Sequence, residues 1–115
     1  MNSLKDMIIF SVLTSIFVLA VINCGVYEHE LAHKAIFQSY GIKSVITMNY
    51  LGNGYTQPVN LKNGTLTKEE VNQMNGYHIW NEIVGYHLQP IFLCMAIITM
   101  CILYSTIFKE EGDKL

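Results

Sequence analysis

Two histidines four residues apart frame the sequence His29-Glu30-Leu31-Ala32-His33. On a helix their side chains project from one face about one turn apart, so both imidazoles can reach a single divalent metal ion such as zinc. Glu30 is rotated away from that face and can instead reach a water molecule bound to the metal. The pattern predicts zinc ligands at His29 and His33 and, at Glu30, a general base that activates the zinc-bound water.

An alternative interpretation is that the two histidines are interfacial residues at the end of a membrane helix. They directly follow residues 7–27 and Glu28, and residues 7–27 carry no charged side chain. As a helix, that stretch is long enough to cross a bilayer core of about 30 Å. Ionisable side chains close to the hydrocarbon are costly and usually have a functional reason, which favours the metal site.

A second apolar stretch, residues 83–108, contains no Lys, Asp or Glu. A composition of 51% hydrophobic and 14% charged residues is also unlike that of a soluble domain. Two crossings place both termini on one side of the membrane and residues 28–82 on the other. We therefore expect one membrane-integrated domain over residues 1–115, mainly α, with two transmembrane helices; the sequence does not identify the membrane.

The segment between the two spans is expected to begin with more helix and continue as a β-hairpin. Residues 28–40 contain neither proline nor glycine, and Gly41 has the position of a helix C-terminus. In residues 43–61, branched and aromatic side chains flank a Leu-Gly-Asn turn at 51–53, which predicts two strands. Pro58 lacks an N–H group and makes the second strand an edge.

A long second helix is expected over residues 68–108, where it includes the second span. Thr67 and Glu70 have the spacing of a capping box, in which each side chain accepts a hydrogen bond from the other residue's backbone N–H. The first proline after them is Pro90, so we expect the helix to continue to that point and to kink there.

A catalytic zinc site normally has three protein ligands and an open position for water. Three side chains near the second span can supply the third ligand: His78, Glu82 and His87. Glu82 is the predicted ligand, because it lies at the same membrane face as the histidine pair and has no lysine spaced to pair with it. Gly85, one turn further, would let another helix approach closely. Alternatively, Glu82 is an interfacial charge that faces lipid headgroups.

His78 shares the helix face of Glu82, whereas His87 lies about 140° away from it around the helix. We expect His78 to act at the catalytic site, either behind a metal ligand or as a donor to the oxyanion. His87 becomes a ligand only if the helix unwinds near Pro90. Either histidine can also be a simple interfacial residue.

The first half of the chain resembles the membrane-embedded zinc metalloproteases, particularly the site-2 protease group. The likeness covers about the first sixty residues: a span that leads into HELAH, more helix, and extended segments like the hairpin of those enzymes. It implies that His29 and His33 bind zinc and that Glu30 activates water. The second half departs from the group, which uses an aspartate of an Asp-Gly motif; the pair Asn81-Glu82 instead looks like that of glutamate-type zincins.

The predicted function is therefore a membrane-integrated zinc metalloprotease that hydrolyses peptide bonds at or within the membrane. Its expected partners are the lipid bilayer and a peptide or membrane-protein substrate, which an exposed hairpin edge could hold as an added strand. Because two spans can hardly shield a hydrolytic site, we also expect a homo-oligomer or a partner. A net charge of −2 without arginine argues against nucleic-acid binding.

Two other functions fit the same residues. One is a non-catalytic metal-binding membrane protein, a sensor or accessory subunit, in which His78 or His87 completes a closed four-ligand site. The other is a small interaction protein without a metal.

Overall fold

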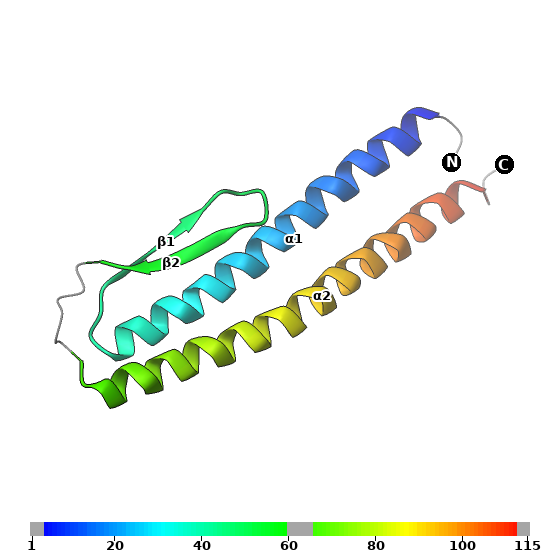
Figure 1. Cartoon of the computed structure of the whole chain (residues 1–115). Helices are drawn as coiled ribbons and strands as arrows, with labels where there is room; N and C mark the ends of the chain where they lie inside the picture. The colour runs from blue at the N-terminus through cyan, green and yellow to red at the C-terminus, as the bar shows by residue number, and fades with distance from the viewer. Residues whose placement is uncertain (1–3, 60–65, 113–115) are drawn as a thin grey trace.

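The computed structural model describes residues 4–59 and 66–112. It consists of helix α1 (Leu4–Ser39), strands β1 (Ser44–Met48) and β2 (Gly54–Pro58), and helix α2 (Lys68–Gly112) (Figure 1). Both helices are long and apolar enough to cross a membrane. The expected fold class is confirmed: the chain is mainly α, with a β-hairpin between two long helices.

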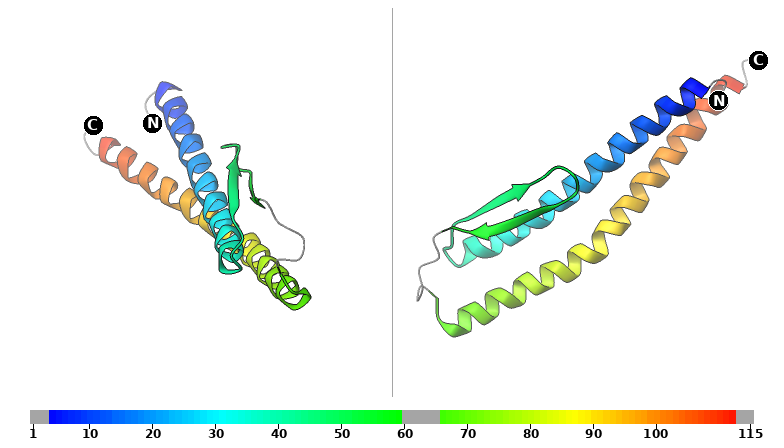
Figure 2. Two further views of the ribbon diagram at one scale, coloured as in Figure 1. Left: turned by 90° about the vertical axis from the view of Figure 1, so that its left-hand side faces the viewer. Right: turned by 45° about the horizontal axis from the view of Figure 1, so that its top comes forward.

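The molecule is elongated, with extents of 74 × 21 × 15 Å. The two helices run antiparallel, so that the beginning of α1 and the end of α2 lie at the same end of the molecule (Figure 1). The hairpin covers the other half of α1, on the side away from α2. Helix α2 stays helical through Pro90 and bends in its middle, as expected for an internal proline (Figure 2).

Local sequence explains where α1 ends. Gly41 adopts a left-handed conformation with φ of 71°. Its N–H donates to the carbonyl of Gln38, and the N–H of Ile42 donates to the carbonyl of Phe37. These two bonds form a Schellman motif, which a glycine completes at little steric cost.

The predicted capping box begins α2. The hydroxyl of Thr67 accepts the N–H of Glu70 at 3.2 Å, and the carboxylate of Glu70 accepts the N–H of Thr67 at 2.7 Å. Both bonds satisfy N–H groups that the first helical turn leaves without partners.

The hairpin is antiparallel, with Ser44 opposite Pro58 and Met48 opposite Gly54. Its tip folds back along α1 to the level of Asn23. The Asn23 amide donates to the carbonyl of Tyr50 at 3.0 Å and accepts the N–H of Gly52 at 3.2 Å. The tip therefore lies beside residues of the apolar stretch 7–27, nearer the beginning of α1 than the histidine pair.

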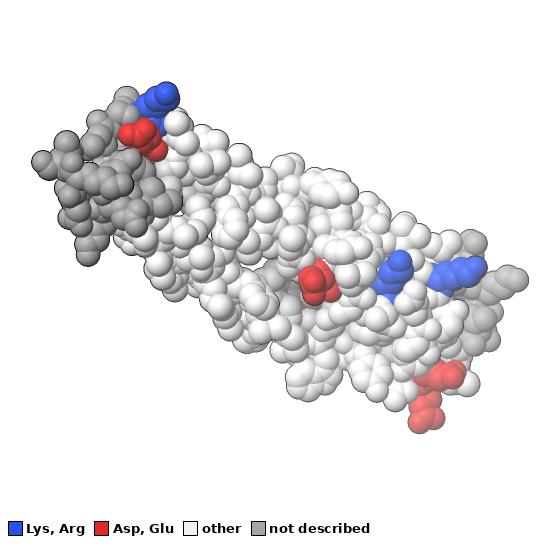
Figure 3. Space-filling view, turned by 180° about the vertical axis from the view of Figure 1, so that it is seen from behind, with Lys and Arg blue, Asp and Glu red and all other residues white. Residues whose placement is uncertain are grey.

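Little of the apolar surface is buried within the protein. In the most apolar part of α1 no residue is buried within the protein. In the most apolar part of α2, 6% of the residues are buried. Figure 3 shows a broad band without Lys, Arg, Asp or Glu between the charges near the termini and those of the opposite half. Helices that formed the core of a soluble protein would instead be covered by protein.

Candidate functional site

Three side chains from the two helices converge where α1 leaves its apolar stretch. The Nε2 atoms of His29 and His33 lie 3.2 Å apart. From α2, Glu82 places Oε1 3.0 Å from Nε2 of His33 and Oε2 3.5 Å from Nε2 of His29. The structure thus brings together the three residues that the sequence analysis selected as metal ligands.

The distances within this cluster fit the coordination of one small cation. Ligand atoms bound at about 2.0–2.1 Å to a tetrahedral zinc ion lie about 3.3 Å from one another. The two Nε2 atoms lie 3.2 Å apart, that of His33 lies 3.0 Å from Oε1 of Glu82, and that of His29 lies 3.5 Å from Oε2. One ligand atom from each of the three residues lies within 4.8 Å of the others. The two imidazole planes stand at 88° to each other, so the rings meet edge to face rather than stack.

Close contact between the helices positions the cluster. Gly85 of α2 lies against the His29 ring, and a Cβ atom added there would lie 2.7 Å from Cε1 of that ring. The side chain of Asn81 donates to the backbone carbonyl of His29 at 3.2 Å. Together these contacts fix the level at which Glu82 meets the histidines.

Glu30 is held by the hairpin. It is 6% exposed, and the hydroxyl of Thr56 in β2 lies 2.7 Å from its Oε2 and 2.9 Å from its backbone carbonyl oxygen. Among the described residues, Thr56 is the hydrogen-bond partner of this carboxylate. The hairpin therefore fixes the residue that the sequence analysis expected to act as general base.

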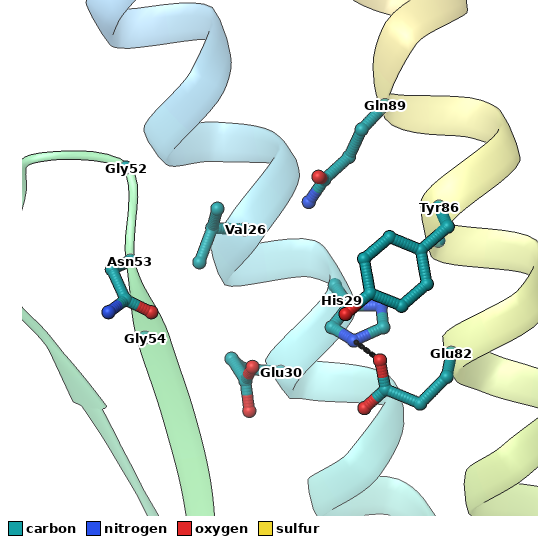
Figure 4. A pocket seen from close by; sticks show the side chains of 10 residues that line it. Val26, His29, Glu30, Gly52, Asn53, Gly54, Glu82, Tyr86 and Gln89 are labelled. Atoms are coloured by element: carbon teal, nitrogen blue, oxygen red, sulfur yellow. Dashed lines mark ion pairs between the residues drawn. The ribbon is translucent and has the colours of Figure 1, made fainter.

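A cleft of about 260 Å³ joins these elements (Figure 4). Glu30 and Glu82 enter it from either side of His29, and Tyr86 and Gln89 extend the α2 wall towards the apolar part of the molecule (Figure 4). The full lining is Val26, His29, Glu30, Gly52, Asn53, Gly54, Glu82, Gly85, Tyr86 and Gln89. Two carboxylates and no lysine line this cleft, which suits it to a cation.

His78 and His87 have different surroundings. Nδ1 of His78 lies 2.7 Å from Nδ1 of His33, on the side of that ring opposite the cluster. His78 does not line the cleft, so its position favours the role behind a ligand over that of oxyanion donor. His87 is exposed and bonds its own helix, with Nδ1 2.7 Å from the carbonyl oxygen of Ile83. It is not part of the cluster.

The sequence analysis did not single out Thr56 or Asn23, and both bear on the site. A threonine in a strand gives no signal that it will meet a glutamate of a distant helix. An asparagine within an apolar stretch does give one, because its amide needs a hydrogen-bond partner if it lies in hydrocarbon.

Comparison of this chain with protein-family models, with curated proteins and with solved structures finds no match.

Proposed function

We propose that this protein is a membrane-integrated zinc metallopeptidase that cleaves peptide segments at or within the membrane. The observation that carries the proposal is the convergence of His29, His33 and Glu82 beside a cleft that Glu30 also lines. Two of the three candidate ligands, His29 and Glu82, line this cleft. Three ligands beside an open space are the arrangement of a catalytic zinc site, whereas structural zinc sites are closed by a fourth ligand.

The exposure of both helices supports the membrane location. Most of their apolar side chains are not buried by other parts of the protein. A lipid bilayer would supply the apolar surroundings that favour such surfaces. Helix α1 is about 54 Å long and α2 about 68 Å at 1.5 Å per residue, so both exceed the hydrocarbon thickness. The cluster then lies near one interface, and the cleft extends from it towards the hydrocarbon.

Each residue of the site has a role in this hydrolysis. His29, His33 and Glu82 would hold zinc, which when bound polarises the scissile carbonyl and lowers the pKa of its water to about 7. Glu30 takes a proton as water oxygen adds to the carbonyl carbon, and returns it to the amine as the C–N bond breaks. The buried Glu30 needs a hydrogen-bond partner in both states. Thr56 can donate to the carboxylate, or accept from the protonated acid while it donates to the Glu30 carbonyl.

The outer edge of β2 offers a place for an extended substrate. The bonds from Val59 to Lys43 and from Asn49 to Asn53 join odd-numbered residues that directly flank the two strands. Because hydrogen-bonded pairs alternate, Gly54 and Thr56 direct their backbone N–H and C=O groups outward. A peptide added to this edge would lie beside the cleft, and Pro58, which has no N–H, limits how far the pairing extends.

Replacement of Glu30 by Gln tests the proposal. The variant keeps the size of the side chain and removes the base, so we expect zinc to stay bound and cleavage to stop. The purified full chain in detergent micelles is assayed with a quenched-peptide library and for zinc content. Glu28→Gln is the matched control, because Glu28 is the exposed neighbour of His29 and should leave both properties unchanged.

Two results would overturn the proposal. Cleavage that persists in Glu30→Gln would rule out the mechanism. Bound zinc without any cleavage by the wild-type chain would favour the non-catalytic metal-binding protein instead.

A further inference from the structure

The two ring nitrogens of His33 face different partners. Nε2 faces the carboxylate of Glu82 at 3.0 Å, and Nδ1 faces Nδ1 of His78 at 2.7 Å. The rings of His33 and His78 are inclined by 27° with centroids 4.9 Å apart, so they meet edge to edge. At this separation one Nδ1 atom must carry a hydrogen and the other a lone pair.

A bound cation sets the direction of this bond. A metal ion at Nε2 needs the lone pair there, so a neutral His33 must hold its single proton on Nδ1 and donate it to His78. His78 then accepts at Nδ1 and carries its own proton on Nε2.

Without a cation the direction reverses. An ionised Glu82 can only accept, so the contact between its Oε1 and Nε2 of His33 requires the proton to be on Nε2. When His33 is neutral, this proton is its only one, so its Nδ1 is a lone pair and His78 must donate to it from its own Nδ1.

The surroundings of His78 do not favour either direction of the hydrogen bond between the two Nδ1 atoms. The ring of Phe37 packs against His78 with centroids 4.6 Å apart. Nε2 of His78 is buried and has no hydrogen-bond partner among the described residues. Because no bond at Nε2 favours either tautomer, the state of His33 decides where the His78 proton lies.

We propose that His78 positions the metal ligand His33 and that the N–H···N bond between them reverses when a divalent cation enters. The inference rests on the proposed metal site and adds to it a hydrogen bond whose direction depends on whether the cation is bound. On reversal His33 exchanges its Nε2 proton for one on Nδ1, and His78 exchanges its Nδ1 proton for one on Nε2. Each ring keeps one proton, so both imidazoles stay neutral and no net proton is released from the pair.

Two substitutions of His78 distinguish its role as hydrogen-bond acceptor for Nδ1 of His33 from a role in packing alone. Asn places its amide oxygen near the former Nδ1 position and can accept from His33, whereas Leu fills space without an acceptor. We expect His78→Leu to weaken Zn²⁺ binding by about 10–100-fold and His78→Asn to restore most of that loss. Zn²⁺ affinity is measured by chelator competition on the full chain in detergent micelles. His87→Leu, which removes an exposed histidine of the same helix, should bind like wild type.

Nitrogen-15 NMR of the histidine rings tests the reversal directly. In the metal-free wild-type chain the His78 proton should reside on Nδ1, and after addition of Zn²⁺ on Nε2. Protonation of the same nitrogen in both states, or equal Zn²⁺ affinity of wild type and His78→Leu, would overturn this inference and leave the peptidase proposal standing. A wild-type chain that binds no Zn²⁺ would overturn both.

Discussion

The backbone of Gly85 lies directly against the imidazole ring of His29. A Cβ atom at this position would overlap Nδ1 and approach Cε1 to 2.7 Å, so either the ring or the helix would have to move. The distance between the helices at the cluster of His29, His33 and Glu82 is thus set by the absence of a side chain at residue 85.

Replacement of Gly85 by Ala should therefore damage the site. Overpacking of this kind typically costs about 1–3 kcal/mol, and displacement of His29 should weaken Zn²⁺ binding by about 5–100-fold. Gly76→Ala is the matched control in the same helix, because a Cβ atom there meets nothing within 4 Å. The control should instead stabilise α2 by about 0.5–1 kcal/mol. Equal Zn²⁺ affinity in the two variants would contradict the role assigned to Gly85.

The sequence predicts most of this arrangement because its strongest signals are local. The Schellman glycine, the capping box and the apolar stretches each depend on a few neighbouring residues, and all appear where expected. Helical spacing also placed His78 and Glu82 on one face, and both contact His33. The sequence also anticipated a close approach at Gly85, but not that the His29 ring would be the group it contacts.

The relations that escaped prediction are contacts between elements far apart in the chain. Thr56 meets Glu30 because the hairpin folds back along α1, and the turn residues alone do not set that direction. The hydrogen bonds from Asn23 to the hairpin tip fix the direction in which the hairpin folds back. Residues 23 and 50–52 are far apart in the sequence, so their pairing cannot be predicted without the tertiary arrangement. The same limit applies to the hydrogen bond between the Nδ1 atoms of His33 and His78.

Glu82→Gln tests the third ligand. The amide keeps the size of the side chain but loses its charge, so the cluster would offer two neutral imidazoles and a weak carbonyl donor to the cation. We expect Zn²⁺ affinity to fall at least about 100-fold, which corresponds to about 2.7 kcal/mol. Chelator competition measures the change, with Glu28→Gln as the charge-matched control. An affinity within threefold of wild type, on the order of 0.6 kcal/mol, would remove Glu82 from the site.

Thr56→Val should separate the hairpin's effect on Glu30 from metal binding. Valine has the shape of threonine without the hydroxyl, so the Glu30 carboxylate loses a charge-assisted hydrogen bond worth about 1.5–3 kcal/mol. We expect kcat to fall by about 10–100-fold with zinc content unchanged, and Thr56→Ser to retain most activity. Thr47→Val is the control, because Thr47 is an exposed threonine of β1. Loss of zinc in Thr56→Val would show that Thr56 supports the metal site rather than the base.

Asn23→Leu should release the tip of the hairpin from α1. Asn23 makes two hydrogen bonds to the tip, and each typically contributes about 0.5–1.5 kcal/mol. Opening of the tip should become easier by about 1–3 kcal/mol, which predicts faster hydrogen exchange at the N–H of Gly52 by about 5–150-fold. The exchange is measured by NMR or mass spectrometry on the full chain in lipid nanodiscs, with Asn75→Leu on the exposed surface of α2 as the control. Because the tip lines the cleft, cleavage should slow in parallel while zinc stays bound. Unchanged exchange at Gly52 would mean that packing of the tip, rather than Asn23, holds the hairpin beside the site.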